Sequence, residues 1–184
     1  MSRAILIDNF LPQDTFDAIS EKVTHSEHWV SGKLGDFVRD ELWDEVTDLV
    51  FQRCKEIDLY NEHRFPLDKK NANFSHNQFR PHNYHHNNEQ GPHADNGSYV
   101  FYIHPDWDEA WGGKLQIVNA EEEQYREGIF AKPNRFVWMN PRVLHDITRT
   151  GDTPHARATN LGFLNTCFDN NPVGVDYINI STTD

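Results

Sequence analysis

The sequence predicts a mainly β fold of the α+β class, a sandwich or barrel in which two N-terminal helices support one sheet. Helical periodicity occupies two segments of the first part, and short apolar runs separated by turn residues take over from about residue 74. With 184 residues, 37% of them hydrophobic, the chain is long enough to bury one core. We expect a single domain over 1–184, with helical support over about 1–72, a β core over about 73–165 and a tail over 166–184.

Two amphipathic helices are predicted in the first part. A short strand over 4–10 precedes the first helix, for which Asp14 is the expected N-cap. The second helix covers 41–57 and has acidic residues in its first turn. Between them, 29–38 is expected to form a strand and a turn. The apolar stripe of the first helix comprises Phe16, Ile19 and Val23.

The second part has the pattern of short strands separated by Gly, Pro and Asn. Many short strands at this spacing are typical of a sandwich or barrel. The tail after residue 165 is rich in Asn, Thr and Asp, and we expect it to be partly disordered. The predicted strands are 73–80, 98–104, 114–119, 128–131, 135–139, 145–148 and 156–164.

Charge and composition exclude several classes of protein. A net charge of −12 argues against nucleic acid as a partner, because phosphate backbones are bound by clustered Lys and Arg. No segment has the pattern of a signal peptide or a membrane span, so a cytoplasmic protein without membrane contact is expected. Two cysteines, Cys54 and Cys167, are too few for a disulfide framework and fit a reducing compartment.

A candidate metal site begins at His93 and Asp95. In an extended segment these side chains lie on the same face, where one ion can bind both. His145, after an aromatic run, is the expected third ligand. Two His and one carboxylate with open positions suit non-haem Fe(II) and oxygen chemistry. With 11 His the spacing also arises by chance, and it recurs at 104–106, where the central Pro indicates the end of a strand rather than a ligand pair.

Arg157 is the candidate for binding a co-substrate. Oxidation at such a site commonly uses 2-oxoglutarate, whose distal carboxylate needs a cation in a largely apolar pocket. Arg157 opens an apolar run, and an Arg at the head of a barrel strand can point inward and bind a carboxylate with two hydrogen bonds. The alternative is that Arg157 reaches the surface and pairs with an acidic side chain there.

A group of three histidines precedes His93. His82, His85 and His86 could bind zinc or nickel, but no Cys accompanies them and their spacing suits a loop. We therefore favour solvated loop histidines or a rim that contacts the substrate.

The order of motifs along 74–164 resembles the prolyl 4-hydroxylase-like branch of the Fe(II)/2-oxoglutarate-dependent oxygenases. Seven elements in sequence are more specific than any one of them. The strand and turn over 102–108 look like those of the oxygen-sensing prolyl hydroxylases. The seven elements are His93-Ala94-Asp95, Phe101-Tyr102-Ile103, Asp106-Trp107, Gly112-Gly113-Lys114-Leu115, Pro133 before Phe136-Val137-Trp138, His145 and Arg157.

The resemblance implies a fold and a set of roles. The fold is a double-stranded β-helix, a jelly-roll or cupin-like barrel, supported by the two N-terminal helices. Arg157, Tyr102 and Tyr84 would bind 2-oxoglutarate, although both tyrosines could instead be core or rim aromatics that use their hydroxyls elsewhere. The implied iron ligands, which are also the catalytic residues, are His93, Asp95 and His145.

The implied reaction is hydroxylation of a C–H bond with Fe(II), 2-oxoglutarate and O2, releasing succinate and CO2. Ascorbate is a further expected reductant. The substrate would be a peptide, protein or amino acid, with peptidyl proline suggested by the likeness. Asp95 favours hydroxylation over halogenation, because halogenating relatives have a small residue there.

Three features depart from the family pattern. The loop over 81–90 is crowded with His and amide residues, the gap between His145 and Arg157 is longer than usual, and Leu161 replaces a small polar residue. Two other functions remain open from the sequence. One is a cupin-like metal-dependent isomerase or hydrolase, and the other is a binding module with a vestigial metal site.

Overall fold

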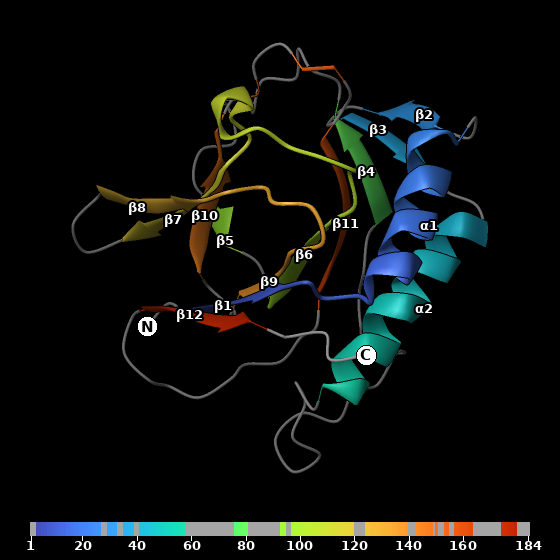
Figure 1. Ribbon diagram of the computed structural model, residues 1–184. Coiled ribbons are helices and arrows are strands. Elements are labelled where there is room, and N and C mark those ends of the chain that lie inside the picture. Colours follow the sequence, from blue (N-terminus) through green and yellow to red (C-terminus); the bar gives the residue numbers. More distant parts are fainter. Residues whose placement is uncertain are drawn as a thin grey trace.

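The computed structural model consists of two β-sheets and two helices arranged in layers (Figure 1). Both helices lie on one side of the larger sheet, and the smaller sheet lies on its other side. The structure describes residues 3–26, 29–32, 35–38, 41–57, 76–80, 93–94, 97–119, 124–139, 143–148, 150, 153–154, 157–163 and 174–179.

The described strands divide between the two sheets. The larger sheet has the order β12-β1-β9-β6-β11-β4-β3-β2, and the smaller has the order β5-β10-β7-β8. Neighbouring strands are antiparallel except β1 and β12. The elements are β1 (Arg3–Asp8), α1 (Gln13–Thr24), β2 (Trp29–Gly32), β3 (Gly35–Val38), α2 (Glu41–Glu56), β4 (His76–Arg80), β5 (His93–Ala94), β6 (Ser98–Tyr102), the 3-10 helix η1 (Glu109–Trp111), β7 (Leu115–Asn119), β8 (Gln124–Ile129), β9 (Phe136–Met139), β10 (Leu144–Ile147), β11 (Arg157–Phe163) and β12 (Gly174–Asn179).

The first core cluster lies between the helices and the larger sheet. Apolar side chains of α1 and α2 pack on alternate residues of β1, β6 and β9. A buried polar bridge crosses the same layer, where Asn160 accepts a hydrogen bond from Tyr99 Oη (2.8 Å) and donates one to Thr47 Oγ1 (3.3 Å). Burial raises the pKa of Tyr99, which therefore keeps the proton that it donates.

The second core cluster fills the space between the two sheets. The other alternate residues of the central strands point into it, including Val100 and Tyr102 of β6 and Val137 and Met139 of β9. Every residue of β6 and β9 is buried, because these strands have a packed layer on each side. The interior between the sheets is therefore a closed, largely apolar space.

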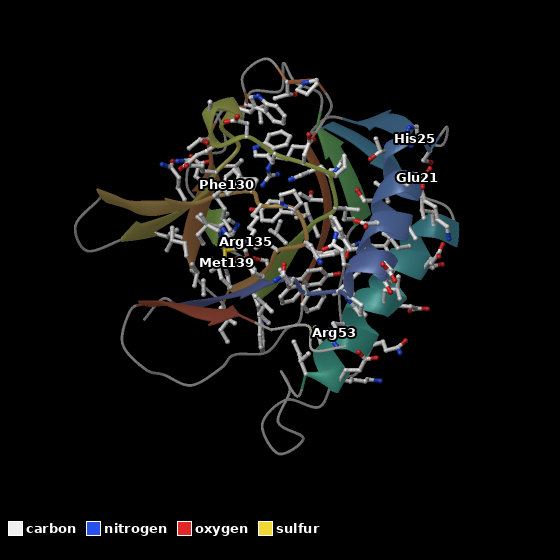
Figure 2. The ribbon with its side chains drawn as sticks, in the orientation of Figure 1. Glu21, His25, Arg53, Phe130, Arg135 and Met139 are labelled. Carbon is white, nitrogen blue, oxygen red and sulfur yellow. The ribbon has the colours of Figure 1, made fainter. Side chains whose placement is uncertain are left out.

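The end of β1 is fastened to the turn before β9. Asp8, 3% exposed, accepts hydrogen bonds from Arg135 Nε (2.6 Å), Arg135 Nη2 (3.1 Å) and Lys132 Nζ (2.9 Å). Arg135 also donates to the carbonyl of Phe130 (3.0 Å), and its place beside that residue can be followed in Figure 2. On the helical side, Arg53 of α2 donates to the carbonyl of Phe10 (2.6 Å).

The structure confirms most predicted elements, corrects the cap of the first helix and the start of one strand, and adds a strand in the tail. The predicted helix cap was wrong, because α1 is preceded by Pro12 as its N-cap and Asp14 lies in its first turn, where a carboxylate still interacts favourably with the helix dipole. In the tail, 174–179 forms β12 and pairs in parallel with β1, so this part is ordered. β8 begins four residues before the strand predicted at 128–131. Among the described helices, neither α1 nor α2 is long and apolar enough to cross a membrane.

Candidate functional site

Arg157 lies in the interior between the two sheets. It is the first residue of β11 and is 1% exposed. Its Nε donates to the carbonyl of Gly113 (3.1 Å), its Nη2 lies 3.3 Å from Tyr102 Oη, and its guanidinium carbon is 5.0 Å from the centroid of the Tyr102 ring. Arg157 therefore points inward, as predicted, and contacts the predicted tyrosine.

The guanidinium of Arg157 has unused hydrogen-bonding capacity. Its Nη1 is buried and has no hydrogen-bond partner within the described part of the chain, and none of the described carboxylates forms an ion pair with it. A buried cation without a counter-charge is costly, and a guanidinium does not lose its proton in a protein. This geometry fits an anionic ligand, and a carboxylate can accept two parallel hydrogen bonds from such a group.

The diglycine turn gives Arg157 the room that it occupies. Gly112 and Gly113 have φ values of 75° and 68°, a region that favours glycine. A Cβ at Gly113 would lie 2.9 Å from Arg157 Cδ and 3.0 Å from Thr150 Cγ2. The second glycine therefore both exposes a carbonyl to Arg157 and leaves space for its side chain.

His145 on β10 is oriented by a hydrogen bond from its ring. It is 6% exposed, and its Nδ1 lies 2.9 Å from the carbonyl of Val143. Because a carbonyl only accepts, Nδ1 is the donor in this contact, and such a hydrogen bond is typical of a histidine whose other ring nitrogen binds a metal. His145 is opposite Ile117 in the sheet, and Ile117 belongs to the cluster between the sheets. His145 thus belongs to the same interior as Arg157.

Two of the predicted iron ligands occupy facing positions in the smaller sheet. His93 on β5 is paired with His145 on β10. Directly opposite residues of an antiparallel pair share one face of the sheet, with Cβ atoms about 4.5–5.5 Å apart. The register therefore puts the two positions next to one another, although they are far apart in the sequence.

The remaining predicted site residues lie outside the described part of the chain. These are Asp95, Tyr84 and the histidines of the preceding loop, His82, His85 and His86. Cys167 is outside it too, whereas Cys54 is buried and forms no disulfide in the described part of the chain. Within the described ranges, no three His, Cys, Asp or Glu side chains come together in a way that could hold a metal ion.

The second His-x-Asp spacing lies beyond the end of β6. His104 is 1% exposed and its Nε2 donates to the carbonyl of Ala131 (2.7 Å), which ties the strand end to the start of the turn before β9. Its ring stacks at a tilt between Tyr102 (5.8 Å) and Trp107 (4.7 Å).

The sequence did not reveal two partners of Arg157. The contact with the Gly113 carbonyl and the packing against Thr150 depend on how the sheets stack. In the sequence, the second glycine of the diglycine pair is the one signal at these two contacts, and by itself it predicts only a turn.

Comparisons with known proteins identify the family of the chain. Residues 71–165, more than half of the chain, match the sequence profile of the 2OG-Fe(II) oxygenase superfamily. The chain belongs to this superfamily, whose members use Fe(II), 2-oxoglutarate and O2. The predicted family is thereby confirmed, and both Arg157 and His145 fit the chemistry that it implies.

A solved structure shares the fold. A prolyl-4-hydroxylase from Pseudomonas putida superposes with a TM-score of 0.55 at 16% sequence identity, covering 90% of this chain and 88% of that one. At this identity the likeness concerns the fold alone. The search of curated protein sequences gave no significant match.

Proposed function

We propose that the protein is an Fe(II)- and 2-oxoglutarate-dependent dioxygenase that hydroxylates a C–H bond and releases succinate and CO2. The observation that carries the proposal is the buried guanidinium of Arg157, which keeps one nitrogen without a partner in the described interior. A dicarboxylate co-substrate supplies the missing counter-charge. Family membership supports the same co-substrate.

Each predicted site residue has a role in this proposal. Iron is bound by His93, Asp95 and His145, and when bound it supplies the activation of O2 that drives the oxidation. The hydrogen bond from His145 Nδ1 to the Val143 carbonyl orients the ring, and Nε2 is the atom that we propose as the metal ligand. The distal carboxylate of 2-oxoglutarate is bound by Arg157, with Tyr102 and Tyr84 as hydrogen-bond donors.

We further propose that the two sheets form one double-stranded β-helix within a single domain. From β4 to β11 the chain alternates between the sheets, apart from the β7–β8 hairpin in the smaller one. In the second core cluster, residues of β1, β6, β9 and β11 in the larger sheet pack against residues of β7, β8 and β10 in the smaller. The apolar interior keeps water from the proposed site.

A peptidyl proline is our proposed substrate class. Its support is the fold shared with a protein described as a prolyl-4-hydroxylase. A requirement for ascorbate and a cytoplasmic location remain predictions from the sequence.

The test is succinate formation. The purified protein is incubated in air with Fe(II) and 2-oxoglutarate, with and without a pool of proline-containing peptides, and succinate and peptide masses are measured. We expect succinate in both samples, more of it with peptide, and a gain of one oxygen atom in a peptide.

Two variants give the test its controls. His145→Ala should lose iron to a weak chelator, because two remaining ligands hold a divalent ion poorly. His25→Ala, which removes an exposed histidine at the C-cap of α1 (Figure 2), should retain the iron. If the wild-type protein forms no succinate, and shows no visible charge-transfer band when Fe(II) and 2-oxoglutarate are added without oxygen, the proposal fails.

A further inference from the structure

Trp107 lies beside both partners of Arg157. It is 7% exposed and belongs to the cluster between the sheets. Its indole Nε1 donates to the carbonyl of Gly112 (3.0 Å), and its ring lies 4.7 Å from that of His104, which in turn lies 5.8 Å from the ring of Tyr102. The indole of Trp107 thus contacts the diglycine turn directly. It reaches Tyr102 only through the ring of His104, which lies between them.

The hydrogen bond to Gly112 fixes a flexible part of the chain. Gly112 has φ 75° and ψ −143°, close to a conformation that only glycine adopts readily, and another glycine follows it. Two successive glycines allow many backbone orientations. The indole N–H selects one of them, in which the next carbonyl, that of Gly113, accepts the Nε proton of Arg157.

Other contacts hold the turn together with Trp107, and Gly112 forms an antiparallel bridge with Thr150. The Gly112 N–H donates to the carbonyl of Glu109 (3.2 Å), and the Lys114 N–H donates to Thr148 Oγ1 (2.8 Å). Between these anchors, the described contact to the Gly112 carbonyl is the one from Trp107. Without it, the peptide between Gly112 and Gly113 loses its side-chain donor, and the next peptide, which carries the acceptor for Arg157, keeps only the anchor at Thr148.

We propose that Trp107 is a positioning residue for the co-substrate. Its indole N–H holds the diglycine turn so that Arg157 presents its Nη1 to a carboxylate. Trp107 does not itself touch the co-substrate. This inference rests on the proposed function, because it concerns the affinity for 2-oxoglutarate.

Trp107→Phe keeps an aromatic ring but removes the donor. We expect 2-oxoglutarate to bind about three- to tenfold more weakly, the fold-change that corresponds to the loss of one ordinary hydrogen bond. Binding is measured by calorimetry on the full chain loaded with Mn(II), which prevents turnover. The dissociation constant of the metal, and kcat at saturating 2-oxoglutarate, should stay unchanged while KM rises.

Trp138→Phe is the matched control. Trp138 is also buried, but it lies on the opposite face of the larger sheet, in the cluster under the helices. The same substitution there should lower thermal stability and leave the dissociation constant of 2-oxoglutarate unchanged. This outcome separates positioning from a general loss of core packing.

The results that overturn the inference differ from those that overturn the function. If the wild-type protein binds 2-oxoglutarate and Trp107→Phe binds it equally well, Trp107 has no positioning role. If the wild-type protein does not bind it, the proposed function fails as well. Should the variant not fold, exchange of the five indole protons is followed by NMR in the wild-type protein. The Trp107 proton should exchange more slowly after 2-oxoglutarate is added, and an unchanged rate overturns the proposal.

Discussion

Arg157 uses only part of its donor capacity in the contacts described above. A guanidinium carries five N–H groups in a planar fork, whereas the ammonium of lysine is a point charge on a flexible stem. The Nε contact to the Gly113 carbonyl and the packing on the Tyr102 ring set the orientation of the fork. A lysine at position 157 would therefore keep the positive charge but not the arrangement of N–H donors that arginine provides.

Arg157→Lys should weaken 2-oxoglutarate binding about 10- to 100-fold, because charge-assisted hydrogen bonds are lost while the positive charge remains. Iron should stay bound, since no proposed ligand changes. Calorimetry with Mn(II) measures both affinities. Arg53→Lys on α2 is the control, and it should change stability only. Equal affinity in Arg157→Lys would mean that another cation binds the carboxylate.

Gly113→Ala should impair the same site from the backbone side. The new Cβ would meet Arg157 Cδ at 2.9 Å in a residue with φ 68°, so both contact and conformation become unfavourable. We expect a loss of about 1–3 kcal/mol in the free energy of unfolding, and weaker 2-oxoglutarate binding. Chemical denaturation and calorimetry measure the two effects.

Gly128→Ala provides the comparison for this substitution. A Cβ there would lie 3.1 Å from Cβ and 3.2 Å from Cδ of Lys114, so this site is crowded too, but Arg157 is not among the atoms that the new Cβ would meet. Its affinity for 2-oxoglutarate should equal that of the wild-type protein. If both alanine variants lose affinity for 2-oxoglutarate to the same extent, the effect is general and does not come from the contact between position 113 and Arg157.

Among the elements, β1 depends on contacts with distant segments for its position. Asp8 at its end is buried and paired with Arg135 and Lys132. Asp8→Asn keeps the shape of the side chain and leaves a buried guanidinium without its charge partner. We expect a loss of about 3–5 kcal/mol in the free energy of unfolding, measured by urea denaturation. Glu45→Gln, which breaks the exposed pair with Lys22, should cost less than about 1 kcal/mol.

β12 covers the outer edge of β1. Removing residues 174–184 should expose the backbone groups of β1 that now pair with residues 174 to 179. We expect a lower melting temperature and concentration-dependent aggregation, followed by calorimetry and light scattering. A chain that ends at residue 179 keeps β12 and should behave like the full chain. Equal stability of both shortened chains would show that this edge needs no cover.

The elements differ in how well the sequence predicts them. The helices were predictable because an apolar stripe at intervals of three and four residues is a local signal, as at Phe16, Ile19 and Val23. The true start of α1 was not, because Pro12 serves as its N-cap without a side-chain hydrogen bond. β12 was missed because its order comes from pairing with β1, at the other end of the chain.

The site shows the same division between local and distant signals. Arg157 was predictable from its place at a strand start and Tyr102 from the family resemblance, and the structure brings them together. His93 and His145 face one another because of the register between their strands. Neither sequence motif contains information about that register. The Gly113 carbonyl lies 44 residues from Arg157 in sequence, so only the stacked sheets reveal that contact.

For the whole molecule, ligand binding should raise the melting temperature, because the proposed ligands bind the folded chain alone. At a hundredfold excess over the dissociation constant, a ligand adds about 2.7 kcal/mol. For a chain of this size that corresponds to an increase of about 5–10 °C. Calorimetry with Mn(II) and 2-oxoglutarate together measures the shift.

His145→Ala should abolish most of this shift while keeping the melting temperature of the ligand-free chain within a few degrees. The two core clusters do not involve a metal, so removal of metal by a chelator should leave the fold intact. If Mn(II) and 2-oxoglutarate still raise the melting temperature of His145→Ala by the full amount, the metal binds elsewhere in the protein.

The position of β1 between β9 and β12 also determines when the larger sheet can be completed during biosynthesis. β1 hydrogen-bonds to residues 136–139 on one side and 174–179 on the other. Both partners are translated long after β1, so β1 stays unpaired in this sheet until β9 has been made, and its second edge stays unpaired until β12 has been made. Closing loops of this length slows folding, so we expect the native sheet to form after synthesis and over a longer time than in a protein built from local contacts.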